Sequence, residues 1–141
     1  MFEASHSERT KASPAAVWEL WEDPARWPEW NEQLEYGELE GEFAEGERIR
    51  VKFRRGGKMQ FEIVAIEPGR LFVDESRLPG ARFGHEHRVE SLGGGMAEIT
   101  HRLYVRGFMS WFWSLLLGRK RMRESVVQFC ERERELAEAA S

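Results

Sequence analysis

Hydrophobic and polar positions alternate through the middle of this chain, and the period changes towards the C-terminus. Between residues 48 and 105, apolar side chains recur at every second position, in segments separated by glycine or proline turns. A period of two is typical of β-strands with one buried face, and short turns predict an antiparallel meander. By this pattern, and with weaker alternation near the N-terminus, seven strands are expected at residues 2–10, 35–41, 48–53, 59–63, 71–78, 81–92 and 96–105.

Helical signals lie on either side of the meander. Ser13-Pro14 combines an N-cap residue with a proline at the first helical position, and Asp23-Pro24 repeats the signal. Two short helices are therefore expected after the first strand. In the last third an apolar stripe follows helical spacing and predicts a helix of about thirty residues, roughly 45 Å long, which Gly118 bends or divides. The stripe consists of Phe108, Trp111, Phe112, Leu115, Met122, Val126 and Phe129.

The order of the expected elements predicts the fold class. A sheet with one apolar face needs a cover, and the C-terminal helix alone is long enough to provide it. We therefore predict an α+β fold in which a seven-stranded curved antiparallel sheet wraps around a long C-terminal helix. A length of 141 residues suits one domain, residues 1–141.

Composition narrows the classes of function. The net charge of −4 provides no basic field, so nucleic acid is not expected as a partner. The single cysteine, Cys130, cannot form an intrachain disulfide, and the N-terminus lacks the basic and apolar regions of a signal peptide. Both features favour a cytoplasmic location. The longest apolar stretch, residues 108–117, is too short to span a bilayer.

Several segments resemble the START-like superfamily. ASPAAVWELW at residues 12–21 and DPARWPEW at residues 23–30 resemble its opening, and GEFAEG at residues 41–46 and EPGRL at residues 67–71 are further matches. The closest branch is the polyketide cyclase/dehydrase and lipid-transport group, often called SRPBCC, and the order of elements matches over the whole chain. The resemblance implies a helix-grip fold with a cavity for an apolar ligand. It does not imply a reaction, because this fold serves binders, transporters and enzymes.

Two of the expected strands place histidines on the apolar face. If the hairpin between them centres on Gly94, His87 faces His101, and Glu86 faces Arg102 on the opposite face. This register satisfies both faces of the sheet, because it pairs opposite charges on one and apolar neighbours on the other.

The same register places His85 opposite Leu103, and a two-residue turn at Pro79-Gly80 would place Asp74 beside His85. Three interpretations stay open. The histidines are polar core residues with satisfied hydrogen bonds, or they line a cavity and recognise polar atoms of a ligand, or they include a catalytic His–Asp pair or a metal site. No short metal-ligand motif supports a metal, and no cofactor is expected.

We therefore predict that the protein binds a small hydrophobic ligand that is lipid-, polyketide- or aromatic-like. An alternative is an enzyme of the cyclase/dehydrase type, with His85 as general base and Asp74 orienting it. Arg119 lies on the apolar stripe. Two interpretations are open: its guanidinium group reaches water, or it anchors a ligand carboxylate. The other predicted cavity residues are Trp30, Phe53, Phe61, Phe72, Phe83, His85, His87, His101, Leu103, Phe112, Leu115, Met122 and Phe129.

Residues 108–117 are apolar on all sides. Packing against the sheet explains only one apolar stripe of this segment and leaves its other apolar side chains without a partner. Arg119, Lys120, Arg121 and Arg123 follow directly. A second alternative is therefore an interaction or membrane-docking module, as a homodimer or a peripheral membrane contact. The net negative charge favours the homodimer. The residues expected to make this contact are Trp111, Trp113, Leu116 and Leu117.

Overall fold

The computed structural model describes residues 1–140 and has the predicted α+β architecture. The seven-stranded antiparallel sheet has the order β1-β7-β6-β5-β4-β3-β2, so that the two strands nearest the N-terminus form its opposite edges. The strands are β1 (Phe2–Thr10), β2 (Leu34–Leu39), β3 (Arg48–Phe53), β4 (Lys58–Glu67), β5 (Leu71–Leu78), β6 (Ala81–Gly93) and β7 (Met96–Arg106). The helices are α1 (Pro14–Trp21), the 3-10 helix η1 (Pro24–Glu29), α2 (Ser110–Leu117) and α3 (Arg119–Ala139).

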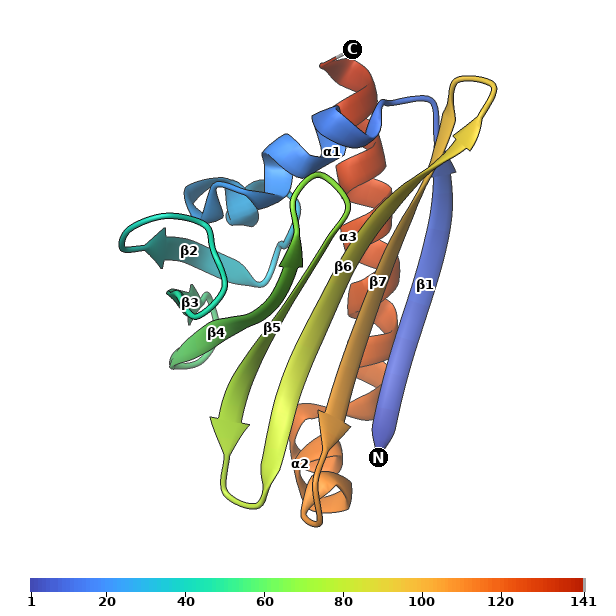
Figure 1. Ribbon diagram of the computed structural model, residues 1–141. Helices are drawn as coiled ribbons and strands as arrows, with labels where there is room; N and C mark the ends of the chain where they lie inside the picture. Colours follow the sequence, from blue (N-terminus) through green and yellow to red (C-terminus); the bar gives the residue numbers. More distant parts are fainter. Residues whose placement is uncertain (141) are drawn as a thin grey trace.

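Helix α3 runs along one face of the sheet beside β1 and β7, as in a helix-grip fold (Figure 1). The residues it buries there lie at helical spacing and include Met122, Val126, Phe129 and Ala137. Register irregularities in β2, β4 and β6 interrupt the ladder, and such bulges bend strands. The sheet therefore curves around the helix, as the sequence pattern predicts.

The predicted helix starts after β1 are confirmed. The Ser13 hydroxyl accepts a hydrogen bond from the Ala16 amide at 3.2 Å, and the Asp23 carboxylate accepts one from the Ala25 amide at 3.1 Å. These caps satisfy amides that helix geometry leaves without an internal partner. Helix α1 lies at the end of the sheet where the C-terminus also lies, and α2 lies at the opposite end (Figure 1).

The expected long C-terminal helix is divided in two at Gly118. This residue has φ of +96°, a conformation that favours glycine, so the hydrogen-bond ladder of α2 does not continue into α3. Helix α2 begins at Ser110 and has no side-chain cap. The stripe predicted across both helices therefore changes phase at this break.

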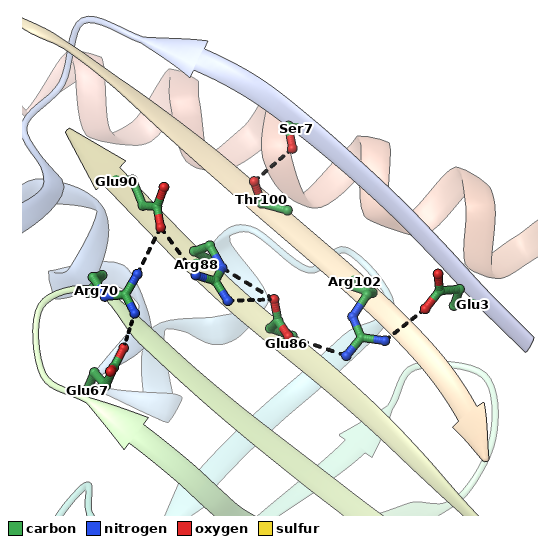
Figure 2. Close-up of polar contacts among 9 residues, drawn as sticks. All are labelled: Glu3, Ser7, Glu67, Arg70, Glu86, Arg88, Glu90, Thr100 and Arg102. Atoms are coloured by element: carbon green, nitrogen blue, oxygen red, sulfur yellow. Dashed lines mark hydrogen bonds and ion pairs between the residues drawn. The ribbon is translucent and has the colours of Figure 1, made fainter. Parts of the chain in front are cut away.

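The outer face of the sheet is charged. Figure 2 shows ion pairs that link neighbouring strands: Arg102 of β7 contacts Glu86 of β6 at 3.3 Å and Glu3 of β1 at 2.9 Å. Arg88 and Glu90 of β6 continue the row at 3.2 Å. Such pairs oppose register slips, because a shift of one residue would bring charges to the inner face. The predicted pairing of Glu86 with Arg102 is confirmed.

Four tryptophans lie in or beside α1 and η1 and close one end of the inner face. Trp21 and Trp30 are almost fully buried, and Trp21 packs edge-on against Phe72. The indole of Trp27 donates to the Trp21 carbonyl at 2.9 Å, and that of Trp30 donates to the Leu20 carbonyl at 3.0 Å. The inner face is thus densely filled at this end, and the space for a ligand lies elsewhere.

Among the helices of residues 1–140, none is both long and apolar enough to cross a membrane.

Candidate functional site

A cavity of about 760 Å³ opens between the inner face of the sheet, α3 and the β3–β4 hairpin. Its volume lies within the range of pockets that bury drug-sized molecules. The walls are mainly apolar and come from strands, η1 and α3 together. The apolar residues are Trp27, Trp30, Leu34, Val51, Phe53, Met59, Phe61, Phe83, Leu103, Leu117, Met122 and Phe129.

Polar side chains occupy two separate levels of the cavity. At the mouth, Arg54, Arg55, Lys58 and Arg121 are exposed, and the acidic residue among them is Glu32. At the inner end, buried Asp74 and His85 border the apolar space. The cavity therefore combines a basic entrance, apolar walls and a small polar floor.

Most of the predicted cavity residues on strands line this space. Phe53, Phe61, Phe83, His85 and Leu103 border it, as does Asp74. On the opposite wall, the predicted residues Trp30, Met122 and Phe129 also border it. The period of two on the strands places these residues on the inner face.

Three residues predicted to line the cavity lie behind its wall. Phe72, His87 and His101 are each 0% exposed and do not border the space. Phe72 and His87 lie on the inner face as predicted, but the tryptophans of α1 and η1 cover them. His101 is covered by Phe129 and Trp30, at ring-centroid distances of 5.4 and 5.6 Å.

Three other predictions fail because the helix breaks at Gly118. Phe112 and Leu115 lie on the outer surface of α2, 39% and 60% exposed, instead of facing the sheet. Arg119 donates to the Ser114 hydroxyl at 3.0 Å and lies over the Phe2 ring. It does not border the cavity. The prediction assumes that one helical stripe continues unchanged past residue 118, and for this reason it places these three side chains on the wrong face.

A chain of short hydrogen bonds leads from the cavity into the core. His85 Nε2 lies 2.7 Å from His101 Nδ1, and His101 Nε2 lies 2.6 Å from Glu133 Oε1. The other oxygen of Glu133 accepts a hydrogen bond from the Trp21 indole at 2.8 Å. The chain joins β6, β7, α3 and α1, and His85 is its only member that borders the cavity.

Burial favours the uncharged forms of the three titratable members of this hydrogen-bond chain. It raises the pKa of Glu133 well above the ordinary value, although the bond from Trp21 acts in the opposite sense. It lowers the pKa of His101 to about 3, and it lowers the pKa of His85 well below the ordinary value, with the neighbouring His101 adding to the shift. A buried charge is costly without solvation, so the neutral form of each group is favoured.

Asp74 is the second buried acid of the cavity. It is 2% exposed, and its Oδ1 has no hydrogen-bond partner within residues 1–140. Burial raises its pKa well above the ordinary value, and the adjacent Glu75 raises it further. Asp74 pairs with His85 across the strands as predicted, but no hydrogen bond joins their side chains. Burial therefore favours the neutral carboxylic acid form of Asp74 beside the cavity.

The three histidines also lie close enough together to be considered as a metal site, with ring nitrogens within 4.8 Å of one another. Two features oppose it. The rings of His85 and His87 stack at 3.6 Å, so that their in-plane lone pairs do not converge on one point. The nitrogens that His85 and His101 turn towards each other are already joined at 2.7 Å.

The sequence interpretation missed two groups of residues. Glu133 follows Met122, Val126 and Phe129 at helical spacing, so a carboxylate on the apolar stripe was a readable signal. The basic residues of the mouth gave no such signal, because their meeting depends on how the β3–β4 hairpin approaches α3.

Comparison with known proteins places this architecture in a family. A family model described as polyketide cyclase/dehydrase and lipid transport matches residues 1–128. The chain belongs to this family. A comparison with curated proteins found no match.

Solved structures similar to this family member share its fold at low sequence identity. Norcoclaurine synthase from Thalictrum flavum, in complex with dopamine and hydroxybenzaldehyde, superposes with a TM-score of 0.74 at 12% identity, over 99% of this chain and 88% of that one. A START superfamily protein from Mycobacterium smegmatis has a TM-score of 0.73 at 11% identity, over 99% of both chains. The di-domain ARO/CYC protein BexL, from the BE-7585A biosynthetic pathway, has a TM-score of 0.71 at 17% identity, over 94% of this chain and 46% of that one. These identities support a shared fold and leave the ligand open.

Proposed function

We propose that the protein binds a small, largely apolar organic molecule in the cavity between the sheet and α3. The observation that carries this proposal is an open space of about 760 Å³ with mainly apolar walls in a well-packed domain. Interiors of this kind rarely leave voids larger than a water molecule. Burial of the ligand's apolar surface would supply the affinity, and the buried acid and histidine would orient it.

The basic mouth favours a ligand with an acidic or strongly polarised end. Arg55, Lys58 and Arg121 have exposed charges around the entrance, while the floor is uncharged. An amphipathic molecule would bury its rings or chain and leave its acidic group at the rim. Aromatic and polyketide-like acids and fatty acids share this chemistry.

Native mass spectrometry of the freshly purified protein tests whether a molecule of this class remains bound. In parallel, the fluorescent probe 1-anilinonaphthalene-8-sulfonate, which has an apolar body and one anionic group, measures binding in the cavity. Met122→Trp fills the cavity and is expected to weaken probe binding at least tenfold. The matched control Lys120→Trp places the same side chain at an exposed position of α3 and should leave the affinity within twofold. Equal affinities of the two variants would overturn the proposal.

A second candidate is catalysis of the cyclase/dehydrase type. The observation that favours it is that Asp74 and His85, both buried and both able to exchange protons, border the same apolar space. The predicted role of Asp74 as the group that orients His85 is replaced, because His101 contacts His85 instead.

The apolar surface of α2 and the residues before it supports a separate proposal, contact with an anionic membrane surface. Phe108, Trp111 and Leu116 are 82%, 59% and 65% exposed, and Leu115 lies with them. The exposed bases Lys120, Arg121 and Arg123 follow on α3. The net charge of −4 favours a homodimer, but these bases lie next to the apolar surface, and their local charge favours an anionic lipid surface as the occupant. Of the predicted contact residues, Trp113 instead donates its indole to the Pro79 carbonyl at 2.8 Å, and Leu117 borders the cavity.

Sedimentation with vesicles of phosphatidylcholine, with and without phosphatidylglycerol, tests this contact. Binding is expected only to the anionic vesicles, and Leu115→Ser/Leu116→Ser should reduce it at least fivefold. The control Leu92→Ser removes an exposed apolar side chain from the β6–β7 hairpin and should bind like the wild type. A concentration-dependent dimer in light scattering, abolished by the same double substitution, would show that a second copy covers the surface and would overturn the membrane proposal.

A further inference from the structure

A neutral Glu133, which burial favours by raising its pKa, gives the chain His85–His101–Glu133 a direction. The indole nitrogen of Trp21 can only donate, so Glu133 Oε2 is an acceptor. The proton of a neutral Glu133 therefore lies on Oε1, directed at His101 Nε2. His101 must then carry its own proton on Nδ1, which donates to His85 Nε2. By the same logic the proton of His85 lies on Nδ1.

This last nitrogen is the end of the chain that faces the cavity. The hydrogen bond of His85 to His101 uses Nε2, which leaves Nδ1 available on a ring that borders the cavity. A ligand oxygen at this place would be the acceptor that completes the hydrogen-bond chain. Every other donor and acceptor of the chain already has a partner inside the protein.

The surroundings of the chain prevent a charge from resting on either histidine. The rings of Trp21, Trp30 and Phe129 lie 5.4 to 5.7 Å from His101, and Phe129 also lies 5.2 Å from His85. This apolar cover separates His101 from water, and His85 meets solvent only through the cavity, so an imidazolium would be poorly solvated at either position. A proton that enters one side of a ring must therefore be matched by one that leaves the other side.

We propose that His85, His101 and Glu133 form a proton relay that delivers a proton from Glu133 to an oxygen of the bound ligand. The proposal rests on the proposed ligand cavity and adds a catalytic residue, His85, and two residues that act through it. The ligand class is a largely apolar molecule with an oxygen acceptor, such as the carbonyl of a ketone, at the depth where it meets His85 Nδ1.

The transfer moves one proton at each link. The N–H bond at His85 Nδ1 breaks as the ligand oxygen takes the proton, and His85 Nε2 takes the proton of His101 Nδ1. His101 Nε2 takes the proton of Glu133 Oε1, which leaves a carboxylate. Both histidines stay neutral with their protons shifted to Nε2. Trp21 Nε1 and His101 Nε2 both donate to the new carboxylate, which lessens the cost of its burial.

For an enolisable ketone the remaining step uses water. As the carbonyl oxygen receives its proton, water at the cavity mouth removes a proton from the adjacent carbon, and the C–H electron pair forms the C=C bond of an enol. The neutral acid of Asp74 borders the same space and offers a second donor to the ligand. The reverse transfer returns the proton to Glu133, so no oxidant or reductant is needed.

Imidazole ¹⁵N NMR of the unliganded wild-type protein tests the direction of the relay without any substitution. Both His85 and His101 are expected as neutral Nδ1–H tautomers, the less common form of histidine in water. An imidazolium, or a proton on Nε2 of either residue, would overturn the proposal.

The reaction is tested with 2-tetralone, a bicyclic ketone, by following the exchange of its C1 protons in D₂O. The wild type is expected to accelerate exchange, and Glu133→Gln and His85→Gln should each lower the acceleration at least tenfold. Glu131→Gln, an exposed carboxyl of the same helix, is the matched control and should exchange like the wild type. Far-ultraviolet circular dichroism of all three variants should match the wild type, which shows that they fold, and the control Glu131→Gln should bind 1-anilinonaphthalene-8-sulfonate within twofold of the wild type. A wild type that binds this probe but gives no acceleration would overturn the relay and leave the proposed binding function intact. Equal probe affinities of Met122→Trp and Lys120→Trp would instead overturn the binding function.

Discussion

Asp74 of β5 and His85 of β6 lie directly opposite each other at the floor of the cavity, yet their side chains form no hydrogen bond. His85 contacts His101 instead, and Oδ1 of Asp74 is left without a partner among residues 1–140. A carboxyl that orients a histidine would be ionised and would accept a hydrogen bond from that histidine. The raised pKa of Asp74 favours its neutral form, which can donate, so the two residues can present two separate donors to one ligand.

Asp74→Asn is expected to stabilise the protein, increasingly so from pH 4 to pH 7. The raised pKa of Asp74 means that the folded state keeps a proton that the unfolded chain releases above about pH 4, so stability falls as pH rises by up to about 1.4 kcal/mol per unit. Asparagine does not titrate and removes this loss. Urea unfolding at both pH values measures the effect, and Glu90→Gln, on the exposed face, is the control. A difference that does not change with pH would contradict a raised pKa.

The three buried histidines should cost the wild type stability as the pH falls from 7 to 5. The pKa values of His85, His87 and His101 are lowered by burial, so below about pH 6.5 the unfolded chain binds protons that the folded state refuses. Asp74 and Glu133 act in the opposite sense over the same range, because their folded-state pKa values are raised. The loss should therefore be steeper in Asp74→Asn than in the wild type, and parallel slopes in urea unfolding would refute this account.

His87→Leu should raise the free energy of unfolding by about 1 kcal/mol at pH 7 and reduce the loss in acid. His87 is fully buried, stacks on Phe72 at 3.7 Å, and has two nitrogens without hydrogen-bond geometry to any described residue. An unsatisfied buried polar group costs about 1–3 kcal/mol, which offsets the stacking that leucine loses. Thermal and urea unfolding measure the change. A destabilised variant would mean that these nitrogens are engaged in solution.

The strand registers could be read from the sequence because a period of two leaves one register that suits both faces. The pairs His87–His101, His85–Leu103 and Asp74–His85 are confirmed for this reason. The hydrogen bonds among these side chains could not be read, because they depend on how α3 is rotated against the sheet. Glu133 shows the limit: its place on the apolar stripe is visible, but its contact with His101 is not.

The prediction of the helical part of the site is wrong because of one residue, Gly118. Gly118 could be recognised as a bend or a break, but the sequence does not fix the change of direction, so Phe112 and Leu115 were assigned to the wrong surface. The side chains after the break, from Met122 on, follow their own regular spacing and were placed correctly. Local periodicity is reliable within one element and carries no information across a change in backbone conformation.

Gly118→Ala should destabilise the protein by about 1–2 kcal/mol and disturb the junction of α2 and α3. Its φ of +96° is strained for any L-residue, and an added Cβ would lie 3.3 Å from Cβ of Arg121. Gly57→Ala is the matched control, since that glycine has no positive φ and open space around it. Equal unfolding midpoints for the two variants would show that the break needs no glycine.

Charge at the cavity mouth should select ligands by their acidic group. Arg55→Glu/Arg121→Glu is expected to weaken binding of 1-anilinonaphthalene-8-sulfonate at least fivefold at low salt and to leave binding of the uncharged 2-tetralone within twofold. The reason is that both side chains border the entrance and are exposed, so they act on a charge at the rim and not on the buried apolar body. Because such surface interactions are screened by ions, the difference between wild type and variant should shrink as salt rises to 1 M. Arg48→Glu/Arg50→Glu changes the net charge equally on β3 away from the cavity and is the control. If that control weakened the probe as much, the attraction would be a property of the whole protein's charge, and the mouth would have no part in choosing the ligand.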